Sequence, residues 1–164
     1  MKRILGIDPG LNTTGYGVIE GVRQGVRLVE AGVIRTPTRG TLGERLAELH
    51  EGIAEVLAAH RPELMALEQL FSHYERPRTA ILMGHARGVI CLNAQLAGIP
   101  IQPFEPTRVK RLLTGNGRAP KQQMQLAVQL QLGLPTIPQP PDVADALAIA
   151  LCGFQFLKFP AVPT

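Results

Sequence analysis

The chain has 164 residues, of which 45% are hydrophobic and 18% are charged. This length suits one domain with a core of its own, and the composition excludes an intrinsically disordered chain. We therefore expect a single domain over residues 1–164. Basic residues outnumber acidic ones by 17 to 13, so the formal net charge is +4.

Cysteine content and hydropathy indicate the compartment. The two cysteines, Cys91 and Cys152, are not expected to form a disulfide framework or a four-ligand zinc site. The first residues, MKRILGID, hold too short an apolar run for a signal peptide, and no run approaches the ~20 apolar residues of a membrane helix. We expect a cytoplasmic protein.

Hydrophobic patterning predicts an α/β fold. Three sequential strands with short links suggest an antiparallel meander, after which helices alternate with two more strands. We expect strands at residues 2–8, Gly15–Val22, Arg27–Arg35, Glu63–Glu68 and Ile99–Phe104, and helices at Thr41–His60, Thr79–Ala97, Pro106–Leu113, Lys121–Leu132 and Val143–Leu157. A polar loop is expected over Gln69–Arg78. The order favours a mixed five-stranded sheet flanked by helices.

The positive charge is concentrated in one part of the chain. Residues 106–141 contain no aspartate or glutamate, and they carry Arg108, Lys110, Arg111, Arg118 and Lys121. Such a segment indicates a polyanionic partner, and a solvated helix face is the alternative interpretation.

The acidic residues give a second signal. The chain has only three aspartates, Asp8, Asp142 and Asp145, and all fall at the ends of predicted elements. Asp8 ends the first strand and Glu68 ends the fourth, while the other two follow a Pro-Pro pair and share one face of the last helix. Because strand carboxyl ends line the crevice of an open α/β sheet, we expect these four carboxylates to converge.

Ordinary structural roles explain some of these residues. Asp8 precedes Pro9-Gly10, a common turn sequence, and Asp142 suits a helix N-terminus. Asp145 is not explained in this way, because its neighbours in DVADALAIALCG are apolar and a buried carboxylate needs a cation or hydrogen bonds. Four carboxylates in one crevice would repel one another unless Mg²⁺ or Mn²⁺ neutralised them. Two such ions roughly 4 Å apart can hold a phosphate for attack by water.

Ordered motifs resemble the RuvC family of bacterial Holliday-junction resolvases. They run in the family's order and spacing from about residue 2 to residue 157, and the ordered set is far more specific than any one motif. The motifs are GIDPG-x4-GYGVI at Gly6–Ile19, IRT at Ile34–Thr36, LEQ-x-F at Leu67–Phe71, ARGV at Ala86–Val89, VK at Val109–Lys110 and DVADALAIA at Asp142–Ala150.

The resemblance implies a fold and a chemistry. The fold would be ribonuclease-H-like. The activity would be that of a Mg²⁺-dependent crossover junction endodeoxyribonuclease of DNA recombination and repair, whose paired nicks leave 5′-phosphate and 3′-hydroxyl ends. Asp8, Glu68, Asp142 and Asp145 would be the catalytic metal ligands for two Mg²⁺ ions per subunit, with Mn²⁺ as a substitute. Some family members carry histidine at the position of Asp142. The implied partners are four-way junction DNA, a second copy of the chain and the RuvA–RuvB branch-migration complex.

Several residues are candidates for DNA contact. Lys110 and Lys121 match basic positions near the scissile strand in the family, and the neighbouring arginines could contact phosphates bidentately. Phe71 lies three residues beyond Glu68, and the resemblance favours it as a wedge at the junction centre, although a loop anchor packed on the core is the alternative. The segment SHYERPR departs from the family. Candidate contacts particular to this chain are therefore Tyr74, Arg76 and Arg78.

Small residues suggest a subunit interface. Ala80, Gly84 and Gly88 recur every four residues on one helix face and would allow close approach of another element. This pattern favours a homodimer interface, with packing against the chain's own sheet as the alternative. A two-fold dimer suits a junction that is cut by two symmetric nicks.

Three other functions are open. The segment GIDPGLNTTGYGV also resembles the phosphate-binding hairpin of actin-like and sugar-kinase-like ATPases, but these need two lobes and an Asp-Gly motif, and no aspartate here precedes a glycine. A YqgF-type nuclease of the ribonuclease H fold, acting on RNA precursors, would share the first motif but is usually shorter and lacks LEQ-x-F. A junction-binding protein without catalysis would have no need of four carboxylates.

Overall fold

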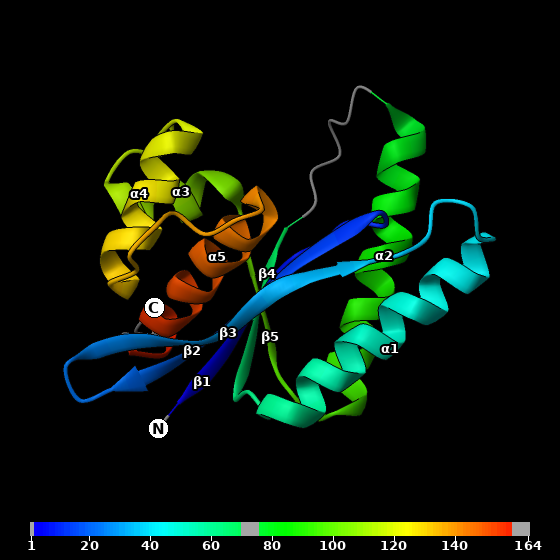
Figure 1. Ribbon diagram of the computed structural model, residues 1–164, viewed down its shortest axis with the longest axis horizontal. Coiled ribbons are helices and arrows are strands. Elements are labelled where there is room, and N and C mark those ends of the chain that lie inside the picture. The colour runs from blue at the N-terminus through cyan, green and yellow to red at the C-terminus, as the bar shows by residue number, and fades with distance from the viewer. Residues whose placement is uncertain (1, 70–75, 159–164) are drawn as a thin grey trace, which may run out of the picture.

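The structure, a computed structural model, describes residues 2–69 and 76–158. These residues form one five-stranded mixed sheet with helices on both faces (Figure 1). The strands are β1 (Arg3–Asp8), β2 (Thr13–Val22), β3 (Gly25–Arg35), β4 (Leu64–Glu68) and β5 (Ile101–Phe104). The helices are α1 (Leu42–His60), α2 (Pro77–Leu96), α3 (Pro106–Thr114), α4 (Lys121–Leu132) and α5 (Pro141–Lys158).

The sheet has the strand order β3-β2-β1-β4-β5. The first three strands pair antiparallel as the predicted meander, whereas β4 pairs parallel with both β1 and β5. Ile7 lies opposite Leu67 in the β1–β4 pair. The residues that follow them, Asp8 and Glu68, therefore end β1 and β4 at the same carboxyl end of the sheet.

Each face of the sheet has its own hydrophobic core. Ile4 of β1 belongs to the core beneath α3, α4 and α5, whereas Leu5 and Ile7 belong to the core beneath α1 and α2. This division follows from the two-residue period of strand side chains. The helix α5 lies along β1, β2 and β4, and Figure 1 shows it between the sheet and the α3–α4 pair.

The helix α5 is the most deeply buried helix of the described residues. Between Val143 and Gly153 every residue except Asp145 is buried. No helix within residues 2–69 and 76–158 has the length and apolar character to span a lipid bilayer. The apolar sequence of α5 therefore serves the core of the protein, and its one acidic interruption marks the side that is not covered.

Several boundaries differ from the predicted ones by two residues. The helices α2 and α5 begin at Pro77 and Pro141, because proline is well tolerated in the first turn of a helix. The strand β5 begins later than expected, because Gly98 turns the chain with a φ of +69° after α2. The two strands β2 and β3 each begin two residues earlier than expected, so their hairpin is longer and its turn tighter.

Candidate functional site

The four predicted carboxylates come together at the carboxyl edge of the sheet. Asp8 and Glu68 end the parallel neighbours β1 and β4, and Asp142 and Asp145 lie in the first turns of α5. Carboxylate oxygens of Asp8, Asp142 and Asp145 lie within 4.8 Å of one another. The tertiary structure thus joins residues from the two ends of the chain into one acidic cluster.

Glycines in the strands allow α5 to approach the sheet this closely. A Cβ atom on Gly15 would lie 2.2 Å from the backbone oxygen of Asp142, and one on Gly6 would lie 2.1 Å from that of Ala146. A larger residue at either position would push α5 away from the strands. This role of Gly6 and Gly15 was not predicted from the sequence. The glycines of GIDPG and GYG, together with the alanine-rich sequence of α5, could have indicated a close approach of the helix to the strands.

The carboxylates destabilise one another as anions. Burial raises the pKa of Asp8 to about 8, and the charges of Glu68, Asp145 and Asp142 add to the rise. Burial also raises the pKa of Glu68, with the charge of Asp145 as the next cause, whereas Lys110 acts in the opposite direction. Burial raises the pKa of Asp145 too, while Lys121 opposes that rise. The two lysines therefore do not fully compensate the negative charge of the cluster.

A cleft of about 280 Å³ opens over this cluster. Asp8, Glu68 and Asp145 line it together with Lys110 of α3 and Lys121 of α4. The Nζ of Lys121 lies 3.9 Å from Oδ2 of Asp145. A phosphate group in the cleft would meet both lysine ammonium groups and carboxylates.

The donor set fits a hard divalent cation. Carboxylate oxygens are the ligands that Mg²⁺, Mn²⁺ and Ca²⁺ take in proteins, and half-buried anions that repel one another gain stability when a cation joins them. The residues present are therefore compatible with metal-dependent hydrolysis of a phosphodiester.

The turn after Asp8 is held by side-chain hydrogen bonds. The hydroxyl of Thr14, which is fully buried, donates to the backbone oxygen of Gly10 at 2.5 Å and accepts from the backbone N–H of Gly10 at 3.2 Å. Thr36 donates its hydroxyl to the backbone oxygen of Leu11. These bonds fix the chain that follows β1. Thr36 belongs to the IRT motif, but the motif did not reveal this hydrogen bond, and Thr14 was not among the predicted residues.

Comparison with known proteins identifies the family. A family model described as "Crossover junction endodeoxyribonuclease RuvC" matches residues 4–153. The chain belongs to the RuvC family. It is 65% identical over 159 residues to the RuvC of Rhodopirellula baltica, which covers 96% of this chain and 88% of that protein. It is 43% identical over 153 residues to the RuvC of Desulforamulus reducens, with 93% of each chain covered.

Solved structures agree with this assignment. The structure of Thermus thermophilus RuvC superposes with a TM-score of 0.87 at 36% identity and 95% coverage of both chains. The complex of T. thermophilus RuvC with a Holliday junction substrate gives a TM-score of 0.87 at 33% identity and 96% coverage of both chains. The yeast mitochondrial Holliday junction resolvase Ydc2 shares the fold, with a TM-score of 0.66 at 13% identity. The predicted ribonuclease-H-like α/β fold is confirmed.

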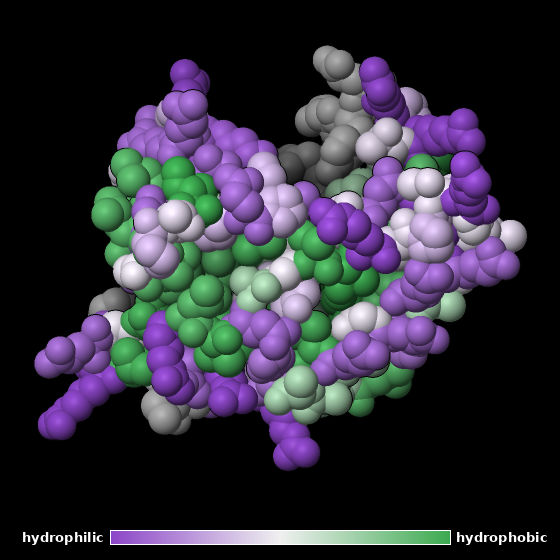
Figure 2. Space-filling model, in the orientation of Figure 1, coloured by the Kyte–Doolittle hydropathy of each residue, from purple (hydrophilic) through white to green (hydrophobic). Residues whose placement is uncertain are grey.

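The other predicted basic residues of the acid-free segment, Arg108, Arg111 and Arg118, are not among the residues that line the cleft. Arg108 stacks over the ring of Phe104, with its guanidinium carbon 5.3 Å from the ring centroid. Arg111 and Arg118 are exposed around the turn that joins α3 to α4. Gly115 in that turn ends α3 with a φ of +78°, so the ordinary turn interpretation explains it. Figure 2 shows hydrophilic side chains at the top of the α3–α4 pair and hydrophobic side chains below them.

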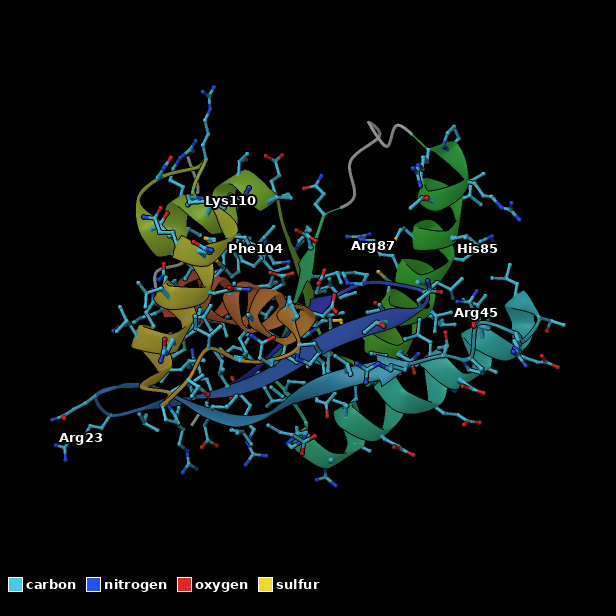
Figure 3. The ribbon with its side chains drawn as sticks, turned by 45° about the horizontal axis from the view of Figure 1, so that its top comes forward. Arg23, Arg45, His85, Arg87, Phe104 and Lys110 are labelled. Carbon is cyan, nitrogen blue, oxygen red and sulfur yellow. The ribbon has the colours of Figure 1, made fainter. Side chains whose placement is uncertain are left out.

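The opposite side of the cleft is only partly described. Phe71 and Tyr74 lie outside the described residues. Arg76 precedes α2 as its N-terminal cap and Arg78 lies in the first turn, and both are exposed. Arg87, in the ARGV motif, was not among the predicted site residues. Its Nε donates to the backbone oxygen of Glu68 at 3.4 Å, and Figure 3 shows it on the side of the sheet edge opposite Lys110.

The predicted small-residue face lies on α2. No heavy atom beyond the local chain lies within 4 Å of a Cβ placed on Gly84 or Gly88. Both glycines are exposed, whereas Ala80 is half-buried. The side chains of Ile81, Leu92 and Leu96 on the same helix are 63%, 56% and 74% exposed. Among the described residues, packing against the chain's own sheet therefore does not account for the two glycines.

Proposed function

We propose that this protein is a structure-selective endonuclease that resolves Holliday junctions in DNA recombination and repair. Its paired nicks would leave 5′-phosphate and 3′-hydroxyl ends. We propose that residues 1–164 act as a single nuclease domain. The observation that carries the proposal is the cleft in which aspartates from β1 and α5 and a glutamate from β4 face Lys110 and Lys121. Its support is the RuvC family and the junction complex of T. thermophilus RuvC.

The proposed catalytic residues are Asp8, Glu68, Asp142 and Asp145, as ligands of two Mg²⁺ ions per subunit for which Mn²⁺ can substitute. When bound, such ions lower the pKa of a water molecule and stabilise the leaving oxygen. The chain itself supplies the geometry, because β1, β4 and α5 hold the carboxylates on three rigid elements. Asp8 and Glu68 share a hydrogen bond when one of them is protonated, and that proton must leave before both can act as ligands.

The lysines would bind the phosphate and limit the repulsion between DNA and the acidic cluster. Lys110 of α3 and Lys121 of α4 line the same cleft, so both can contact a phosphodiester bound there. Lysine makes compact point-charge contacts with phosphate oxygens. The proposed outer DNA contacts are Phe71, Tyr74, Arg76, Arg78, Arg108, Arg111 and Arg118.

Cleavage of a labelled synthetic four-way junction tests the proposal. Wild-type protein should cut the junction with Mg²⁺ or Mn²⁺ and bind it without cutting in Ca²⁺, whose longer and more variable coordination suits in-line attack poorly. Asp145→Asn should abolish cutting, because it keeps the side-chain shape but removes the charge. Glu48→Gln, on the exposed side of α1, is the matched control and should cut normally. Cutting of single-stranded RNA but not of the junction would favour the YqgF-type alternative.

We further propose a homodimer through the exposed face of α2 around Gly84 and Gly88, with Ala80 at its edge. Two carboxylate clefts related by a two-fold axis would match the approximate symmetry of a four-way junction. The RuvA–RuvB branch-migration complex is the proposed protein partner, and the cytoplasm is the proposed compartment. Both cysteines are free in the structure, as a reducing compartment requires.

A further inference from the structure

A second groove lies at the end of the sheet opposite the carboxylates. It has a volume of about 610 Å³, within the usual ~300–1,000 Å³ range of ligand pockets. The C-terminal halves of α1 and α2 form its sides, and the segments leading into β4 and β5 close it. Figure 1 shows the C-terminal ends of these helices at the lower edge of the molecule, whereas β1 and β4 run upward to their carboxyl ends.

The position of the groove separates it from the proposed DNA site. Pro62 lines the groove just before β4 begins, and Glu68 ends that strand. Extended chain rises ~3.3 Å per residue, so about 20 Å of strand lies between the two residues. A ligand in this groove and DNA over the carboxylates would therefore bind to opposite ends of the sheet without competing for space.

The lining of the groove is apolar with a basic rim. Leu57, Ala58, Leu96 and Ile99 are among the apolar residues that line it. Its charged and titratable lining residues are His50 and Arg61, and none of the four glutamates of α1 is among its lining residues. Apolar walls beside one arginine are complementary to apolar side chains that are accompanied by a carboxylate.

Arg61 is also unusual in its backbone conformation. It ends α1 with φ 46° and ψ 60°, and within residues 2–69 and 76–158 it is the one non-glycine residue with positive φ. Glycine is the ordinary residue at such a helix end, because a side chain there is strained. An arginine held in this conformation beside the groove indicates a role for its side chain that glycine could not fill.

We propose that this groove docks a peptide segment of another protein that carries a carboxylate next to large apolar residues. The apolar side chains enter between α1 and α2, and the carboxylate pairs with Arg61. The docking site does not depend on the nuclease assignment, and it stays accessible while the opposite edge of the sheet holds DNA.

Selection from a random library of short displayed peptides, with the full chain as target, tests the proposal. The selected peptides should combine Asp or Glu with neighbouring Leu, Ile or Phe. The best peptide, synthesised with a fluorescent label, should lose about tenfold or more in affinity on Arg61→Gly, since a charge-assisted hydrogen bond is lost. Ala58→Trp, which fills the groove, should reduce the affinity to a similar extent.

Arg61→Gly should not destabilise the fold, because glycine adopts positive φ without strain. The Tm of this variant should equal or exceed that of wild type. Arg23→Gly, the same change in the β2–β3 turn far from the groove (Figure 3), is the matched control and should bind the peptide normally. Selected peptides without acidic residues, equal binding by Arg61→Gly, or selection of none would overturn the proposal. So would conversion of a dimer to a monomer by Ala58→Trp in sedimentation, because the groove would then belong to an interface between copies of this chain.

Discussion

The Nζ of Lys121 lies 3.9 Å from Oδ2 of Asp145, so the acid-free segment of the chain reaches the carboxylate cluster directly. The lysine is the first residue of α4, and the aspartate lies in the first turns of α5. The side chain of Lys121 is 59% exposed, which leaves its ammonium group accessible to a phosphate. The basic segment and the acidic cluster thus form one site rather than two separate surface features.

Substitution of the lysines should reduce the salt dependence of junction binding. If Lys110 and Lys121 each contact one phosphate, then Lys110→Ala and Lys121→Ala should each lower the slope of log K against log salt concentration by ~0.9. Binding isotherms at several salt concentrations in Ca²⁺ measure this slope. Arg23→Ala, in the distant β2–β3 turn, is the control and should keep the wild-type slope. A slope unchanged in both lysine variants would mean that the lysines do not contact DNA.

Asp8 should make the stability of the metal-free protein depend on pH. Its pKa rises from 3.8 to about 8 on folding, so the folded chain holds the proton more tightly than the unfolded chain. The contribution of Asp8 to the free energy of unfolding is therefore greatest below about pH 4, and it falls as the pH rises towards about 8. Asp8→Asn removes this titration, so it should melt above wild type near pH 8 and close to it near pH 4.

Thermal denaturation in a chelator measures this difference, with the exposed Glu63→Gln variant as a control. Mg²⁺ should raise the Tm of wild type more than that of Asp8→Asn, because ligand binding to the folded state adds stability. The difference in Tm between Asp8→Asn and wild type should depend on pH. If it were the same at pH 4 and pH 8, burial and charge repulsion would not raise the pKa of Asp8 as described.

Gly15 should be essential for the position of α5. A Cβ on this residue would lie 2.2 Å from the backbone oxygen of Asp142, so Gly15→Ala must displace the start of the helix. We expect a loss of stability of about 1–3 kcal/mol from this overpacking and a large loss of junction cleavage. Gly43→Ala, where nothing lies within 4 Å, is the control and should keep both properties. Normal cleavage by Gly15→Ala would show that the cluster tolerates movement of α5.

Gly84 should control assembly. Its Cβ direction is open, so Gly84→Leu should fold with a Tm close to that of wild type. If α2 forms the dimer interface, the larger side chain should separate the subunits and uncouple the two nicks on one junction. Sedimentation at micromolar concentration measures the first effect, and cleavage of a supercoiled plasmid with a cruciform measures the second. A variant that remains dimeric would place the interface elsewhere, and Gly43→Leu controls for added surface hydrophobicity.

Local patterning was sufficient to predict the elements and their approximate order. Strand periodicity, proline pairs and turn residues depend only on residues that are close in the sequence. The secondary structure that they specify can therefore be predicted from the sequence. The convergence of Asp8 with Glu68 was also predictable, because parallel neighbours end at the same edge of a sheet. The sequence could not distinguish an internal from an external small-residue face on α2, since spacing specifies a helix face but not what covers it.

The sequence by itself determined which residues we propose for the chemistry: three aspartates, one glutamate and a basic segment without acidic residues. Only the tertiary structure decided how closely they meet. The approach of α5 to Gly6 and Gly15, the pairing of Lys121 with Asp145 and the placement of Arg87 beside Glu68 join residues far apart in the chain. Such contacts depend on how helices pack across the whole sheet, and this packing is a property of the assembled core rather than of any local segment.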